Sequence, residues 1–145
     1  MVLNELRTRL AQLSIVKNVP AVMRPRVAMV LLGIGQEGKA NPGFVLFTQG
    51  DPYDDTAYIL LQGSVTVEKG DSPSVEVSAP HLLGEMVQFS PVKERSATVT
   101  SSTSVRLLRF TWIAFFSTAE QLFNPEELDH LKQALEGVAW GHVVE

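Results

Sequence analysis

The spacing of apolar residues along the chain predicts helices at both ends and strands between them. Near the N-terminus leucines recur every three or four residues, at Leu3, Leu6, Leu10 and Leu13. This spacing forms one apolar face of an amphipathic helix. A second, shorter helix is predicted over residues 21–32, with Pro25 near its start. Residues 33–43 hold four glycines and a proline, which predicts turns and an irregular strand.

From Phe44 onward the pattern changes to the short, alternating runs that are typical of strands. Such runs cover residues 44–48, 57–61, 64–67, 75–78, 96–103 and 105–110. Gln62-Gly63 predicts a tight turn, and residues 69–73 form a second turn cluster. Short strands at regular spacing with glycine turns indicate a jelly-roll barrel, also called a double-stranded β-helix.

The C-terminal part returns to helical spacing. Thr111 is a suitable cap for a helix over residues 112–120. Asn124, Pro125 and two glutamates then predict the start of a last helix, with its apolar face at Leu128, Leu131, Leu135 and Val138. We therefore expect a mainly β fold with flanking helices in one domain of 145 residues. N-terminal helices and a lead-in occupy residues 1–42, the barrel 43–110 and C-terminal helices 111–145.

Composition narrows the class of protein. The chain is 45% hydrophobic and 19% charged, as is usual for a soluble globular domain, and its net charge is −4. This acidic balance disfavours nucleic acid as a partner. The longest apolar run, Val27 to Leu32, is too short to span a bilayer, and the N-terminus lacks the order of a signal peptide. We expect a cytoplasmic protein without membrane contact.

Catalytic and metal chemistry find little support. The chain has no cysteine, so disulfides and thiolate ligands are excluded. Its three histidines, His81, His130 and His142, form no His-x-His or His-x-carboxylate pair on a strand, which disfavours a metal enzyme of the cupin type. Residues 51–55 hold three aspartates without the spacing of a calcium loop. A non-catalytic protein without a metal is expected.

The candidate binding residues lie in the segment from Gly84 to Thr98. Glu85 follows Gly84 directly, and Arg95 begins the run Arg95-Ser96-Ala97-Thr98. A carboxylate can accept hydrogen bonds from ribose hydroxyls, and a guanidinium can bind a phosphate through two parallel bonds. Glycine allows a positive φ and close approach of the backbone to a ligand. The alternative is that Arg95 forms only a surface ion pair with Glu85 or Glu94.

Three blocks, residues 43–51, 58–67 and 83–99, together resemble the cyclic nucleotide-binding domain family. Residues 83–99 are similar to the phosphate-binding cassette of its bacterial catabolite-activator-type members. The resemblance implies that Glu85 binds the ribose and that Arg95 and Ser96 face the phosphate. It also implies that small Ala97 lies close to the phosphate. Gly84, Met86 and Thr98 complete the implied ligand-binding set.

The resemblance implies a sensor or regulatory module in signal transduction, whose ligand is cyclic AMP or cyclic GMP. Ser96 favours cyclic AMP, because a threonine is common at this position in cyclic GMP binders. A protein partner or a second copy would read the bound state. The last helix, with Trp140, would cover the base, or else it packs permanently on the barrel or pairs with a second copy. The roughly twenty residues after Pro125 leave no room for a helix-turn-helix reader within this chain.

A second hypothesis stays open beside the sensor. The family has a small residue at the position of Val87 and an aliphatic one at the position of Gln88. These departures favour a fold that has lost its ligand and acts as a protein-interaction scaffold. The sequence leaves open which nucleotide binds, the oligomeric state, and whether the chain is a fragment.

Overall fold

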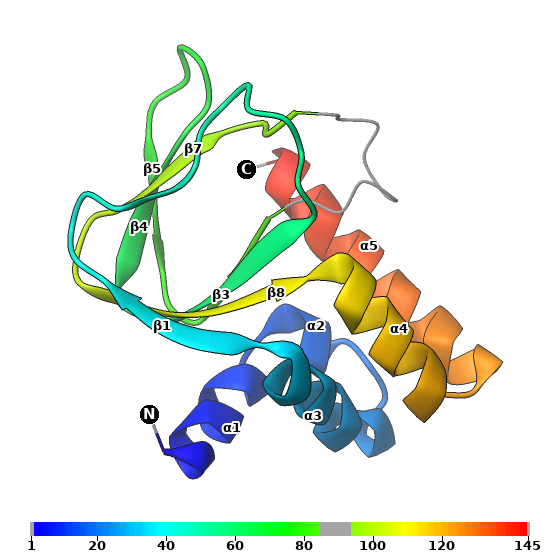
Figure 1. Ribbon diagram of the computed structural model, residues 1–145. Coiled ribbons are helices and arrows are strands. Elements are labelled where there is room, and N and C mark those ends of the chain that lie inside the picture. Colours follow the sequence, from blue (N-terminus) through cyan, green and yellow to red (C-terminus); the bar gives the residue numbers. More distant parts are fainter. Residues whose placement is uncertain (1, 85–93, 145) are drawn as a thin grey trace. The chain divides into compact units, whose positions relative to one another are not determined.

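The computed structural model describes residues 2–84 and 94–144, with side chains described as far as Glu136 (Figure 1). The chain divides into two compact units. One is helical and joins Met1–Gly35 with Phe110–Glu145, and the other is the β unit Gln36–Arg109. Within the described residues, no helix combines the length and apolarity needed to cross a membrane.

The β unit is built from two four-stranded antiparallel sheets. The first sheet has the order β1 (Gln36–Ala40), β8 (Val105–Thr111), β3 (Thr56–Gln62) and β6 (His81–Leu83). The second has the order β2 (Val45–Phe47), β7 (Thr98–Ser101), β4 (Ser64–Glu68) and β5 (Val75–Ser78). These sheets and flanking helices confirm the predicted fold class. Among the described strands, no pairing closes the two sheets into a barrel.

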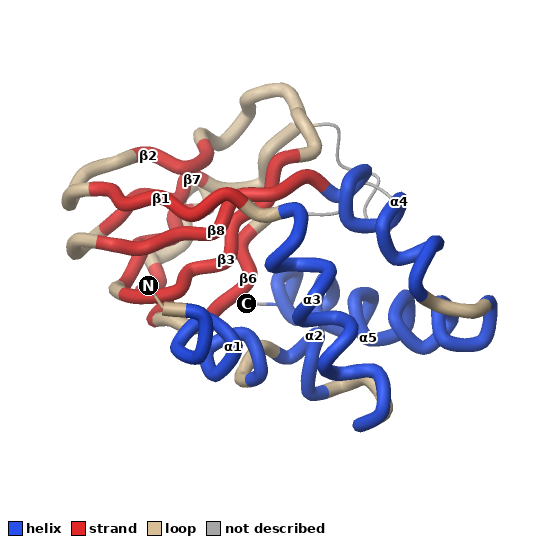
Figure 2. The backbone as a smooth tube through the Cα atoms, turned by 60° about the horizontal axis from the view of Figure 1, so that its bottom comes forward, coloured by secondary structure: helices blue, strands red, loops and turns tan. Residues whose placement is uncertain are grey.

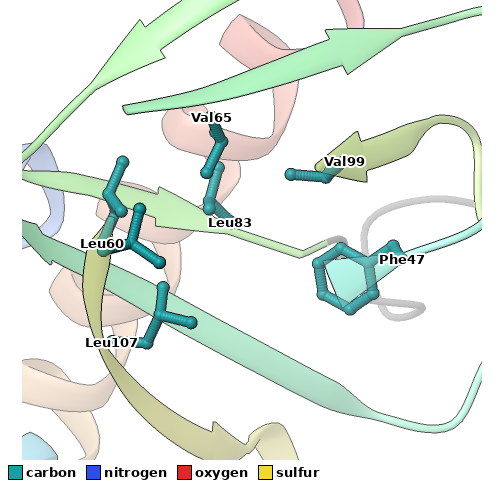
Figure 3. Packing of buried hydrophobic residues seen from close by; sticks show 7 residues of the cluster. Phe47, Leu60, Val65, Leu83, Val99 and Leu107 are labelled. Atoms are coloured by element: carbon teal, nitrogen blue, oxygen red, sulfur yellow. The ribbon is translucent and has the colours of Figure 1, made fainter. Parts of the chain in front are cut away.

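The core of the β unit is formed by side chains from both sheets. It consists of Phe47, Leu60, Val65, Leu83, Val99, Val105 and Leu107, each at most 8% exposed. Figure 3 shows these aliphatic side chains converging from facing strands, with the Phe47 ring at one end. The Phe47 ring meets the edge of Tyr58 at a centroid separation of 5.4 Å. Burial of this apolar surface is the main force that joins the two sheets.

Two strands differ from the sequence expectation. Residues 36–40 form a regular strand that pairs with β8, as at Gly38 and Leu107, where turns and an irregular strand were predicted. They lie at a sheet edge and are mostly exposed, so their apolar pattern carried no signal. β6 was not predicted, because its three residues are too few for a periodic pattern. The turn glycines Gly43, Gly50 and Gly63 have a positive φ.

The described part of the helical unit consists of helices joined by short turns (Figure 2). They are α1 (Leu3–Ala11), α2 (Ser14–Lys17), η1 (Ala21–Met23), α3 (Arg24–Ile34), α4 (Trp112–Leu122) and α5 (Pro125–Val144). Helix α3 packs against α4, and α2 packs against α5. The predicted second helix is therefore a 3-10 turn continued by α3, with Pro25 in the first helical turn as expected. The predicted apolar stripe is divided, because Leu10 and Leu13 are buried while Leu3 is exposed.

Both predicted C-terminal helix starts are confirmed by hydrogen bonds. The Thr111 hydroxyl accepts a hydrogen bond from the Ala114 amide at 3.3 Å. The Asn124 side chain accepts one from the Glu127 amide at 2.8 Å, and Glu127 accepts one from the Asn124 amide at 3.1 Å. This reciprocal capping box satisfies two amides that a helix start leaves without partners.

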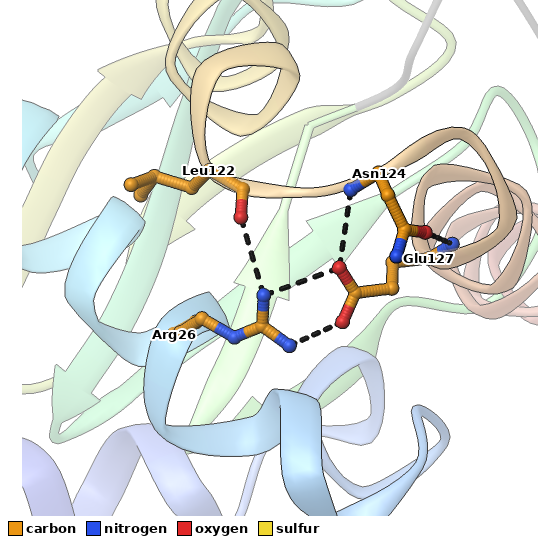
Figure 4. Close-up of polar contacts among 4 residues, drawn as sticks. All are labelled: Arg26, Leu122, Asn124 and Glu127. Carbon is orange, nitrogen blue, oxygen red and sulfur yellow. Dashed lines mark hydrogen bonds and ion pairs between the residues drawn. The ribbon is translucent and has the colours of Figure 1, made fainter.

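Arg26 of α3 binds this helix start from the other half of the unit (Figure 4). Its guanidinium donates to the Leu122 carbonyl at 3.2 Å and forms two bonds with the Glu127 carboxylate. It also lies 4.9 Å from the centroid of the Phe123 ring. A single cation therefore connects the N-terminal helices to the turn between α4 and α5.

The Arg26–Glu127 pair predicts an acid-dependent part of the stability. The hydrogen bond from Arg26, followed by that from the Asn124 amide, lowers the pKa of Glu127. Because the folded pKa is depressed, the stabilisation is complete above the ordinary glutamate pKa of about 4.3 and is lost as the pH falls through the folded value. We expect Arg26→Gln to lower the unfolding free energy at pH 7, with a gap from wild type that narrows in acid.

Urea unfolding of wild type and Arg26→Gln across this pH range measures the gap. Arg109→Gln, an exposed change on β8, serves as the control. If the difference in unfolding free energy between the two proteins stayed constant at all pH values, the stabilisation would not come from the ionised Glu127 carboxylate.

Candidate functional site

The structure describes five of the seven candidate binding residues. Gly84 follows β6, and Arg95, Ser96 and Ala97 lead into β7, which begins at Thr98. Glu85 and Met86 lie outside the described residues, as do the departures Val87 and Gln88. The described candidates all belong to the β unit.

Gly84 has the positive φ that the sequence analysis expected, at +120°. A Cβ added there would lie 3.1 Å from the Ala57 Cα and 3.2 Å from the Ala57 Cβ. Any larger residue at this position would therefore meet both backbone strain and the neighbouring strand β3. Glycine lets the chain leave β6 directly against β3.

The backbone of Arg95 is fixed by the loop between β2 and β3. The Arg95 amide donates to the Asp51 carbonyl at 2.8 Å, and the Gly50 amide donates to the Arg95 carbonyl at 2.9 Å. An isolated bridge between Pro52 and Glu94 continues this pairing. The Gly50-Asp51 turn therefore positions the candidate phosphate-binding residue.

The side chain of Arg95 is buried, with 3% of the residue exposed. Its Nη2 donates to Asp54 Oδ1 at 2.5 Å and to the Thr56 carbonyl at 2.8 Å. The guanidinium carbon lies 3.9 Å from the Phe47 ring centroid and 4.8 Å from that of Tyr53. We call the four residues Phe47, Tyr53, Asp54 and Thr56 the Arg95 cradle.

The cradle is the part of the site that the sequence analysis missed. An ion pair of Arg95 with Glu85 or Glu94 was the alternative prediction, and Glu85 lies outside the described residues. Asp54, 41 positions away in the chain, is a carboxylate partner of Arg95 that was not predicted. The pairing across the Gly50-Asp51 turn brings Asp54 to Arg95, and this pairing has no periodic signature in the sequence. The three aspartates at residues 51–55 were the available signal in the sequence, but they were interpreted only as a possible calcium loop.

Asp54 supplies the negative charge that balances Arg95. Burial acts to raise the pKa of Asp54, but hydrogen bonds from Thr56 and Arg95, together with the Arg95 charge, outweigh it and lower that pKa. The Thr56 amide donates to Asp54 Oδ1 at 3.1 Å. The aspartate side chain remains 68% exposed. The pair therefore has a buried cation and a carboxylate that faces water.

The residues after Arg95 connect β7 to the same loop. Thr98 was expected to share a strand face with Ser96, and its hydroxyl accepts a hydrogen bond from the Gln49 amide at 2.9 Å. Ala97 is buried, with 7% exposed, and Ser96 is half-buried. The segment from Phe47 to Thr56 thus contacts both the backbone and the side chains of the predicted binding run.

Comparison with known proteins gives a family for this architecture. The family model described as "Cyclic nucleotide-binding domain" matches residues 38–121, which include Gly84, the cradle and Arg95. The chain belongs to the cyclic nucleotide-binding domain family, whose members are typically regulatory domains. This confirms the resemblance identified in the sequence.

Among curated proteins, the Pycsar effector protein RsmPycTIR of Rhodovulum sp. (strain MB263) is 33% identical to this chain over 79 residues. That match covers 53% of this chain and 30% of the relative. The matched part of this chain thus corresponds to less than a third of the relative's length. The solved sensor domain of the transcriptional regulator DNR from Pseudomonas aeruginosa is also similar. It has a TM-score of 0.66 and 18% identity, over 90% of this chain and 91% of that one.

The Thermus thermophilus catabolite activator protein is similar in fold as well. Its TM-score is 0.63 at 18% identity, over 82% of this chain and 55% of that one. At such identities the likeness concerns the fold alone. It agrees with the two-sheet β unit and the flanking helices observed here.

Loss of Asp54 should destabilise the β unit, because Arg95 would remain buried without its carboxylate. Removing one partner of a fully buried pair costs about 3–5 kcal/mol. Since the Asp54 side chain is 68% exposed, we expect Asp54→Ala to cost about 1–2 kcal/mol of unfolding free energy. Urea unfolding at pH 7 measures this cost. Asp71→Ala, an exposed change in the β4–β5 turn, should be nearly neutral, and equal effects of the two changes would contradict the role of Asp54.

Proposed function

We propose that residues 1–145 act as a single, non-catalytic cyclic nucleotide-binding module that senses a ligand and passes its bound state to a partner. The family match over residues 38–121 supports the ligand class. The buried and oriented guanidinium of Arg95 is the observation that carries the assignment of the phosphate site.

Arg95 is suited to bind a cyclic phosphate because its surroundings strengthen its field. A cation held against two aromatic rings and away from bulk water attracts an anion more strongly than a solvated one does. A phosphate with two exocyclic oxygens matches the planar guanidinium. In this proposal the phosphate shares Arg95 with Asp54 or takes the place of that carboxylate.

The remaining ligand contacts follow the sequence assignment. Glu85 binds the ribose, Ser96 and the close backbone at Ala97 face the phosphate, and Gly84, Met86 and Thr98 complete the site. Solved relatives are named for cyclic AMP and for cyclic GMP signalling alike, so the preference for cyclic AMP rests on Ser96. A protein partner or a second copy then reads the ligand-bound state.

A scaffold function without ligand is the second candidate, and one observation favours it. Arg95 already has a carboxylate and a carbonyl as partners, so its charge is compensated in the absence of any nucleotide. A domain with this internal pair is able to fold and present surfaces to partners without a ligand. Direct binding measurements separate the two candidates.

Thermal unfolding with and without nucleotide is the first test. A ligand at a hundred times its dissociation constant adds about 2.7 kcal/mol to the unfolding free energy, which raises the Tm of a domain this size by about 5–10 °C. We expect this shift with cyclic AMP, a smaller one with cyclic GMP, and little with linear AMP. Cyclic CMP and cyclic UMP complete the panel. Absence of a shift with every cyclic mononucleotide at millimolar concentration would favour the scaffold.

Substitution of Arg95 tests the phosphate assignment. We expect Arg95→Ala to weaken cyclic nucleotide binding by about 2–5 kcal/mol, because the phosphate loses its charged partner. Arg95→Lys keeps the charge without the planar fork, so its affinity should lie between those of the other two forms. Calorimetric titration measures all three, with Arg109→Ala on β8 as the matched control.

Circular dichroism at the titration temperature verifies that each variant is folded. Wild-type affinity in both Arg95 variants would disprove the assignment of the phosphate to Arg95. A loss of affinity that also occurs in Arg109→Ala would point to a nonspecific charge effect.

A further inference from the structure

Charge is distributed very unevenly along this acidic chain. Residues 1–35 carry five basic side chains and one acidic side chain, which gives this segment a formal charge of +4. Residues 36–145 carry seven basic and fifteen acidic side chains, which gives −8. The N-terminal helices are therefore a basic region in a protein whose net charge is −4.

A groove of about 520 Å³ lies among these N-terminal helices. Arg7 and Ala11 of α1, Val16 of α2, and Ala28, Met29 and Leu32 of α3 contribute to its lining, together with Arg24 at the start of α3. The groove thus combines an apolar floor with two guanidinium groups. No acidic residue is among the described residues that line it.

The two arginines of the groove have no carboxylate partner among the described residues. Arg24 donates only to backbone carbonyls, those of Val19 at 3.2 Å and Lys17 at 3.1 Å. Arg7 is exposed, and the described part of the chain offers it no hydrogen bond or ion pair. Two fixed positive charges beside an apolar surface would complement an anionic, amphipathic partner.

Exposed apolar side chains occur both in the groove, at Met29, and elsewhere on the N-terminal helices. On α1 and the segment before it, Val2 and Leu3 are 65% and 52% exposed. Val22 in η1 is 75% exposed, and Met29 on α3 is 57% exposed. Exposed apolar residues on a surface are typical of sites that bind another protein. Small side chains at Ala11 and Ala28 leave room for a partner's side chain.

We infer that this groove binds an acidic amphipathic helix of a partner protein. The helix lays its apolar face on Ala11, Ala28 and Met29, and its carboxylates meet Arg7 and Arg24. A concave surface fits an inserted side chain better than it fits the face of a bilayer, so a protein segment is favoured over a lipid surface. The inference concerns the helical unit and does not depend on a nucleotide in the β unit.

Fluorescence anisotropy with labelled peptides tests this inference on the full chain. The probe is a helix of about 18 residues with leucines on one face and glutamates on the other. One control peptide has lysines in place of the glutamates, and another has serines in place of the leucines. We expect saturable binding of the acidic peptide, at least about tenfold tighter than that of either control. Equal binding of the lysine peptide would overturn the inference.

Two variants locate the binding site on the protein. Arg7→Glu reverses a charge that has no hydrogen bond or ion pair among the described residues, and Ala28→Leu fills the groove with a good helix-forming residue. Each should weaken binding of the acidic peptide by about tenfold, while Arg109→Glu on β8 should leave it unchanged. Circular dichroism confirms that the variants are folded.

Wild-type binding by both groove variants would overturn the inference. Sedimentation with phosphatidylglycerol vesicles tests the alternative that the basic surface binds lipid. If the protein sediments with these vesicles while the acidic peptide fails to bind, the basic surface is a lipid-binding surface and the inference is wrong.

Discussion

The buried guanidinium of Arg95 is the constraint on which the candidate site depends. A cation cannot be removed from water without compensating partners, and here Asp54, the Thr56 carbonyl and two aromatic rings provide them. Each of these partners lies between β2 and the start of β3, whereas Arg95 precedes β7. The charge therefore adds a side-chain link between two segments that backbone bonds at Gly50 and Asp51 and the Pro52–Glu94 bridge already join. The loop, the strand and the arginine form one structural element.

The sequence predicted what depends on local rules. Helix starts at Thr111 and Asn124 follow from the hydrogen-bonding needs of the first helical turn, and positive φ at Gly84 follows from the absence of a Cβ. The alternation of apolar and polar residues predicted the central strands, because every second side chain of such a strand lies on its buried face. The edge strand β1 escaped prediction, since its stability comes from backbone pairing with β8 and not from its own side chains.

The cradle escaped prediction for a related reason. Phe47 was predicted as part of a strand, and the aspartates at residues 51–55 were considered only as a calcium loop. Their joint role arises only when the Gly50-Asp51 turn pairs with Arg95 and folds the loop over the guanidinium. Contacts over such sequence distances depend on the packing of two sheets, and a single sequence carries no periodic record of them. A sequence motif can thus identify the central residue of a site without identifying the residues that contact it.

Arg95 has a carboxylate partner within its own unit, whereas the groove arginines have none among the described residues. Arg95 and Arg26 are matched to carboxylates within their own units, so they contribute to a defined structure whether or not a ligand is present. Arg7 and Arg24 are placed beside apolar surface without such a match among the described residues, and their charge is available to a partner. In the proposed ligand site a phosphate meets a cation that already has a carboxylate partner, whereas an acidic helix in the proposed groove meets two arginines that have no carboxylate partner among the described residues. The two proposed sites therefore differ in how far the positive charge is compensated before a ligand or a partner arrives.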